Sequence, residues 1–163
     1  MATTGVKFPG SNESVTATGH SSFTWLNPTY VQADDTNYAA VTTNSFDTGT
    51  TTYLLTSYNF DTNWASVPSG ATIDGVIVTI RAWYTDAGVN IDLVQLLDTS
   101  RAVAGTNLAA TPTALTSSEA TYTFGANNNL WGNALTASWV KDQDFGVAIG
   151  CISTGTNSEV RID

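Results

Sequence analysis

The stretch from Val67 to Leu97 carries the clearest alternation of apolar and polar positions in the chain. A turn signal, Pro-Ser-Gly, comes before a β-branched and aromatic run at 76–84. Such side chains suit a pleated, half-buried strand and are poor helix formers. A second turn at 86–88 leads into another alternating run at 91–97, so an antiparallel pair is predicted. The positions expected to share one face of its second strand are Ile91, Leu93, Gln95 and Leu97.

Shorter apolar runs separated by turn residues recur along the rest of the chain. The further strands expected are 23–25, 38–43, 53–60, 120–124, 145–152 and 159–162, with weak strand content at 101–103 and 105–118. One helical turn is expected at 135–141, with Thr136 as its cap and with Trp139 and Val140 facing inward. Many short strands at regular spacing, without βαβ alternation, predict a single antiparallel β-sandwich of jelly-roll type.

Residues 1–20 are polar and are expected to form an N-terminal arm, and the β-sandwich domain is expected over 21–163. The predicted core consists of apolar residues at inward-facing strand positions. These residues are Trp25, Leu54, Ile73, Val76, Val78, Ile80, Leu93, Phe124, Val140, Phe145, Val147 and Ile149, and Trp83 and Trp139 are also assigned to the core.

The charge balance narrows the range of partners. The 163 residues carry a net charge of −9, and only five of them are basic. These five are scattered, whereas nucleic-acid binding needs a basic stripe that replaces counterions on phosphate. Nucleic acid is therefore excluded as a direct partner, and an anionic membrane surface is disfavoured. The charged fraction of 12% is about half that of ordinary domains, which is typical of adhesins, coat proteins and fibres.

Targeting signals are missing from the sequence. No apolar run approaches the roughly 20 residues that a membrane span needs, and residues 1–9 lack the apolar region of a signal peptide. We therefore expect synthesis in a cytoplasm. A surface-type composition without a secretion signal fits a virion component that is released by lysis.

Four motifs in this order resemble β-sandwich, jelly-roll-like modules of tailed-bacteriophage virion proteins. They are Trp25-Leu-Asn-Pro-Thr-Tyr30 with Ala33-Asp-Asp-Thr-Asn-Tyr-Ala39; Tyr53-Leu54 with Asn59-Phe60; Val67-Pro-Ser-Gly-Ala-Thr-Ile-Asp-Gly-Val-Ile-Val-Thr-Ile80; and Leu130-Trp-Gly132 with Trp139-Val140, Asp142, Phe145-Gly-Val-Ala148 and Val160-Arg-Ile-Asp163. The resemblance runs from about Trp25 to the end. The family pattern continues beyond 160–163 into a long strand, so we expect either an incomplete C-terminus or an open sheet edge for a neighbouring subunit.

The resemblance implies a capsid decoration or cement protein on the virion surface. Its partner would be the major capsid protein, and the copies would form a homotrimer at local threefold positions. Two alternatives remain open. One is a tail or head-fibre protein that binds a host-surface glycan, and the other is a stand-alone carbohydrate-binding module.

Aromatic residues in loops are the candidate contact residues. Trp64 lies in the polar segment 61–65 and is the best candidate for stacking on a sugar or for anchoring an interface, and Tyr30 is the second. Asp34, Asp35 and Asn37 could offer oxygen ligands to Ca²⁺, but a turn stabilised by an Asx hydrogen bond is favoured.

Enzymatic motifs are missing from the sequence. Asp142 and Asp144 are expected to be solvated loop charges rather than a glycosidase pair. Cys151 is expected to be a small buried hydrophobe, and the single histidine, His20, lies far from it in sequence. Without a recognisable nucleophile or phosphate-binding motif, we predict a non-enzymatic protein without a cofactor or a metal.

Overall fold

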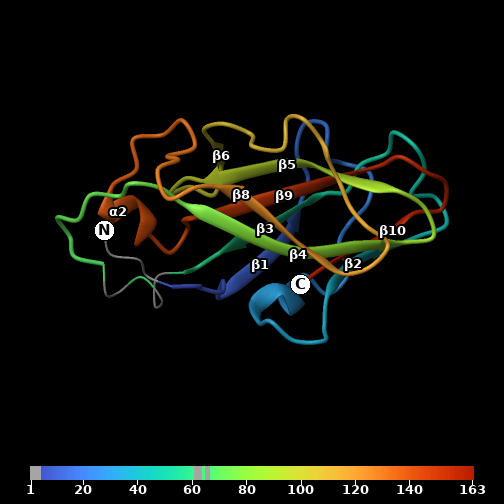
Figure 1. Ribbon diagram of the computed structural model, residues 1–163, viewed down its shortest axis with the longest axis horizontal. Helices are drawn as coiled ribbons and strands as arrows, with labels where there is room; N and C mark the ends of the chain where they lie inside the picture. The colour runs from blue at the N-terminus through green and yellow to red at the C-terminus, as the bar shows by residue number, and fades with distance from the viewer. Residues whose placement is uncertain (1–4, 61–63, 65–66) are drawn as a thin grey trace.

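The protein is an antiparallel β-sandwich of two packed sheets, seen in a computed structural model that describes residues 5–60, 64 and 67–163 (Figure 1). The six-stranded sheet contains β1 (Ser11–Val15), β3 (Leu54–Tyr58), β9 (Gly146–Ser153), β5 (Val89–Leu97), β6 (Val103–Ala104) and β7 (Thr113–Ala114). The four-stranded sheet contains β2 (Ala39–Thr42), β10 (Glu159–Ile162), β4 (Ile77–Thr85) and β8 (Ala120–Gly125). The predicted fold class is confirmed.

The strand β10 occupies an interior position in its sheet. It pairs with β2 on one side and with β4 on the other, both antiparallel. The open edge that was expected near 160–163 is therefore not at β10. The segment 23–25, predicted as a strand, makes only isolated bridges, from Phe23 to Thr52 and from Leu26 to Ala40, because it passes from one sheet to the other.

The sandwich begins earlier than the predicted boundary at residue 21. β1 is the edge strand of the larger sheet and pairs with β3 from Ser11 to Val15. His20 then packs over Gly150 in β9, where the missing Cβ leaves room for the imidazole ring. Residues 11–20 thus either belong to the larger sheet or pack against it, and they do not form a separate arm.

Half of the residues assigned to the core are buried between the two sheets. The buried members are Trp25, Ile80, Phe124, Val140, Phe145, Val147 and Ile149. Three others, Ile73, Val76 and Val78, are only partly buried and pack against the core. Leu54 is buried in a second cluster with Leu97 and Ala148. These last positions lie on the outer face of the larger sheet, because side chains along β3 alternate and Leu55 points inward.

A bulge in β5 explains why the predicted facing of Leu93 is wrong. The pairing with β9 shifts register between Ile91 and Leu93, which inserts one extra residue, Asp92. Ile91 and Val94 therefore both face the main core, while Leu93 packs on the outer cluster. A strict period of two cannot describe both halves of this strand.

Trp83 is also not in the core. Alternation along β4 turns Ala82 inward and Trp83 outward, where its ring packs edge-on against Tyr38 at 5.2 Å between centroids. The Arg161 guanidinium lies 4.6 Å from the Tyr38 ring centroid. Trp83 thus belongs to a half-buried aromatic and cationic cluster on the outer face of the smaller sheet.

The short helix α2 (Ala137–Val140) confirms the predicted helical turn. The Thr136 hydroxyl accepts a hydrogen bond from the backbone N–H of Trp139, as expected for an N-cap. Across the described ranges, no helix has both the length and the apolar character that a membrane crossing requires.

Candidate functional site

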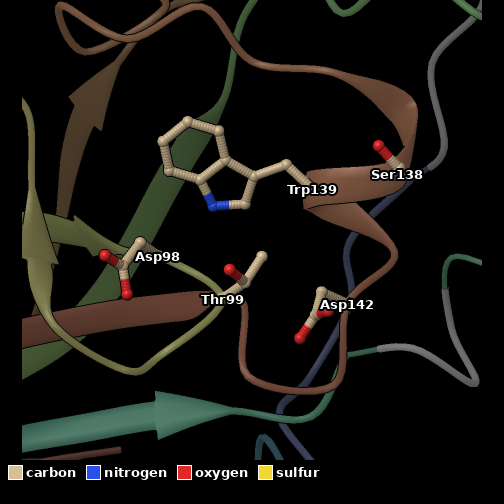
Figure 2. Close-up of a pocket in the computed structure, with 5 residues that line it drawn as sticks. All are labelled: Asp98, Thr99, Ser138, Trp139 and Asp142. Atoms are coloured by element: carbon tan, nitrogen blue, oxygen red, sulfur yellow. The ribbon is translucent and has the colours of Figure 1, made fainter.

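A cavity of about 420 Å³ opens beside α2, where the turn after β5 meets the turn that follows the helix. Figure 2 shows the indole of Trp139 above Thr99, with Asp98 and Asp142 on either side of the space between them. Ser138 completes the lining. The pocket is open to solvent and is a shallow depression rather than an enclosed cavity.

The backbone and the indole ring of Trp139 are each fixed by a hydrogen bond. Its backbone N–H is fixed by the cap residue Thr136, and its indole Nε1–H donates to the carbonyl oxygen of Leu97 at 3.4 Å. The side chain is partly buried, so the ring packs against the main core and also lines the cavity. The indole is therefore a preorganised wall of the pocket, and its only polar hydrogen already has an acceptor.

Asp98 is oriented by its own turn. Its Oδ1 accepts hydrogen bonds from Ser100 N at 2.8 Å, Ser100 Oγ at 2.7 Å and Ala102 N at 3.0 Å. These bonds, with that from the Ser100 side chain as the largest contribution, hold the pKa of the Asp98 carboxyl below its usual value. Asp98 therefore stays ionised at neutral pH.

Asp142 is held in a similar way. Its Oδ1 accepts the backbone N–H of Asp144 at 2.9 Å, an Asx-type turn before β9. Asp142 was predicted as a solvated loop charge, and it lies in the turn after α2, where it lines the open pocket. Asp98 was not singled out by the sequence analysis, although its Asp-Thr-Ser spacing is itself an Asx-turn signal.

The two basic residues nearest the pocket are engaged elsewhere. Lys141 Nζ donates to the Val67 carbonyl at 3.1 Å. Arg101 Nη1 lies 3.1 Å from Glu13 Oε1, and its Nε lies 3.3 Å from Asp144 Oδ1. The guanidinium also covers the Tyr58 ring at 5.0 Å from the centroid. Neither cation therefore forms an ion pair with Asp98 or Asp142 among the described residues.

A smaller cavity of about 190 Å³ lies around this Arg101 cluster. The Tyr58 hydroxyl donates to the Glu13 carboxylate, and burial followed by this hydrogen bond raises the pKa of Tyr58. Asp144, predicted as a solvated charge, is paired with Arg101. Because its cation is already surrounded by acceptors, this cluster stabilises the end of the sandwich and offers no free reactive group.

Four exposed apolar or aromatic side chains lie on β1 or on segments beside it, and we call this set the β1 flank. It consists of Phe8, Val15, Leu26 and Tyr30, each more than a third exposed. The 3-10 helix η1 (Pro28–Gln32) is tied to the start of β1 by a hydrogen bond from Gln32 Nε2 to the Gly10 carbonyl at 3.2 Å. Of the seven exposed large hydrophobic side chains in the part of the chain that the structure describes, four belong to this set.

The two predicted contact residues are placed differently. Tyr30 is on η1 and is 43% exposed. Trp64 is half-buried, and its indole N–H is enclosed without a hydrogen-bond partner among the described residues. Trp64 is thus not a fully exposed platform, and in the part of the chain that the structure describes no hydrogen bond or ring contact joins it to Tyr30.

The segment with Asp34, Asp35 and Asn37 forms the favoured turn. Asp35 Oδ1 accepts the Asn37 backbone N–H at 2.6 Å. Asp34 is ion-paired with Arg81, which also binds Glu119 and Asp163. Within residues 5–60, 64 and 67–163, no group of three or more histidine, cysteine or acidic side chains could hold a metal ion.

Cys151 and His20 do not form a nucleophilic pair. Cys151 is fully buried in the main core, and burial raises the pKa of its thiol well above the usual value, opposite to what a nucleophile needs. His20 Nδ1 lies 3.1 Å from the Thr52 carbonyl, so this nitrogen is the donor, and Nε2 lies 3.6 Å from Asp92 Oδ2. The histidine therefore anchors residues 17–20 on the outer face of the larger sheet.

Asp92 gives a testable pH effect. Burial raises the pKa of Asp92, and the neighbouring His20 opposes the shift. An acid with a raised pKa in the folded state contributes stability below its unfolded pKa and loses it as the pH rises through the folded pKa. Asp92→Asn is therefore expected to become more stable relative to the wild type as the pH rises from the unfolded-state pKa of Asp92 to its folded-state pKa. Urea unfolding from pH 3 to 7 measures this difference. The exposed turn variant Asp86→Asn is the control, and an equal gain there would contradict the prediction.

The chain matches no known family model and no curated protein.

Proposed function

We propose that this chain is a structural protein of a tailed-bacteriophage virion, a decoration or cement protein that binds the outside of the capsid and bridges neighbouring capsomers. The resemblance of its motifs, the β-sandwich architecture and the acidic, sparsely charged composition support this role. Under this proposal the protein is made in the host cytoplasm and functions on the capsid surface. The major capsid protein is its partner, and trimers at local threefold positions are the expected assembly.

The β1 flank is the observation that carries the proposal. Apolar and aromatic side chains gathered on one surface are typical of the centre of a protein–protein interface. Leu26 and Tyr30 are 48% and 43% exposed, and they lie on the segment that connects the two sheets. The hydrogen bond from Gln32 to the Gly10 carbonyl and the bridge from Leu26 to Ala40 hold this segment in place, which lowers the conformational entropy that is lost on association.

The mechanism is burial of surface across subunit boundaries. Each bound copy adds apolar and hydrogen-bonded contact that must break before the shell opens. Repeated copies around a symmetric shell multiply a modest affinity, because the contacts act together.

Substitutions in the β1 flank should weaken capsid binding. Leu26→Ser and Tyr30→Ala are each expected to raise the dissociation constant about tenfold, since loss of a central interface residue costs more than about 1 kcal/mol. Binding to purified capsids is measured by co-sedimentation. Ile77→Ser is the matched control, because Ile77 is 53% exposed but lies on β4, away from the flank. Equal losses for all three variants would contradict a specific interface.

Virions that lack the protein should be fragile. We expect them to lose infectivity at lower temperature and after milder osmotic shock than complete virions, because the bridges between capsomers are missing. Survival curves with and without the gene, and with the gene restored, measure the effect. Identical curves would exclude the cement role.

A further inference from the structure

The Trp139 pocket has an unusual balance of hydrogen-bonding groups. Its two carboxylates each use Oδ1 within their own turns, and within residues 5–60, 64 and 67–163 neither Oδ2 accepts a hydrogen bond. The one strong donor, the indole N–H of Trp139, is used by the Leu97 carbonyl. Ser138 Oγ pairs with Thr136 Oγ1 at 2.9 Å. The pocket therefore offers two carboxylates as acceptors, while the Thr99 hydroxyl is left as a donor with no hydrogen bond among the described residues.

The hydrogen-bonding groups of the pocket favour some classes of ligand over others. A neutral sugar presents hydroxyl groups that both donate and accept, so most of its acceptor capacity would go unused beside two carboxylates and one free hydroxyl. Ammonium and guanidinium groups donate only. They are also attracted to the face of an indole ring, by about 0.5–1 kcal/mol at exposed sites.

The charge of the pocket also favours a cationic ligand. Asp98 and Asp142 are the charged residues in the pocket lining, and the nearby cations Lys141 and Arg101 are bound to other partners. The protein as a whole carries a net charge of −9. The two carboxylates therefore lie in a negative field that attracts cations and repels anions such as acidic sugars.

We propose that the Trp139 pocket binds an organic cation, a guanidinium or ammonium group that stacks on the indole and donates to Asp98 and Asp142. The source of the group is either a basic side chain of a partner protein or a free polyamine. Cation binding does not depend on the virion role, because it follows from the pocket alone and can be measured on the isolated protein.

The test is a titration of the protein, labelled with ¹⁵N, followed by the indole N–H signals in NMR spectra. Trp139→Phe identifies the Trp139 signal. The probes are Nα-acetyl-arginine amide, spermidine, methyl glucoside and Nα-acetyl-citrulline amide, which is the neutral isostere of the arginine probe. We expect the arginine probe or spermidine to move the Trp139 signal in a saturable way, and the citrulline and glucoside probes to leave it in place.

Two variants provide the matched controls. Asp98→Asn and Asp142→Asn keep the acceptor oxygen of each turn and are each expected to weaken cation binding about two- to fivefold. Asp86→Asn removes an exposed charge elsewhere and should leave binding unchanged. Equal responses to arginine and citrulline, a response to methyl glucoside alone, or no saturable shift of the Trp139 signal would each overturn the proposal.

Capsid binding then distinguishes the two sources of the cation, a side chain of the shell and a free amine. If the Asp98→Asn, Asp142→Asn double variant also binds capsids more weakly, the cation is a side chain of the shell. If spermidine binds and capsid binding is unchanged, the cation is a free amine. Failure of capsid binding by the wild-type protein would contradict the proposed function without affecting the NMR result.

Discussion

Trp131→Ala is expected to lower the free energy of unfolding by about 3–5 kcal/mol, the usual cost of removing a buried tryptophan side chain. Trp131 is the largest fully buried side chain among the described residues, at 0% exposure. Its Nε1–H donates to the Val76 carbonyl at 2.9 Å, which ties the loop after β8 to the start of β4. The substitution would leave a cavity and an unpaired carbonyl together.

Urea unfolding followed by circular dichroism measures this loss. Trp131→Phe is the matched control, because it retains an aromatic ring and removes the hydrogen bond, so an intermediate loss is expected. A loss below about 1 kcal/mol for Trp131→Ala would contradict the placement of Trp131 in the core.

Gly146→Ala is expected to destabilise the fold by about 3 kcal/mol, the upper end of the usual range for overpacking. Gly146 begins β9 and pairs with Tyr58 on one side and Leu97 on the other. A Cβ at this position would overlap the Ser57 carbonyl oxygen and approach Tyr58 Cβ to 2.8 Å. Neither atom is the end of a flexible side chain, so the strands themselves would have to move apart.

Gly70→Ala is the matched control for this substitution. Gly70 is exposed, and a Cβ there would meet nothing within 4 Å. We expect its stability to stay close to that of the wild type, or to rise slightly because the unfolded chain loses freedom. Similar losses for the two glycine variants, measured by the same urea unfolding, would contradict the close approach of β3 and β9.

The alternation of apolar and polar residues was sufficient to predict the sandwich, because each strand has one face toward the core. It failed at Leu93, where the β5 bulge changes the facing within one strand, and no local residue pattern marks that insertion. It also failed at Trp83. From the sequence alone, an aromatic residue on the outer face of a sheet cannot be told from one in the core. Only its neighbours Tyr38 and Arg161, which are distant in sequence, identify Trp83 as an outer residue.

The pocket was only partly predictable. The cap at Thr136 and the inward packing of Trp139 follow from local signals near the helix. The position of Asp98 and Asp142 in one pocket does not follow from local signals, because it depends on the β5–β9 pairing that brings the ends of these strands together. Trp131 was missed as a core residue because it follows a turn cluster and has a left-handed backbone, with φ of 57°.

The central claim, that this chain decorates a phage capsid, is tested most directly by adding the purified protein to capsids that lack it and imaging them by cryo-electron microscopy. The proposal predicts regular density on the outside of the shell, between capsomers, with the β1 flank against the shell. Bare capsids, or density only on the tail, would contradict it.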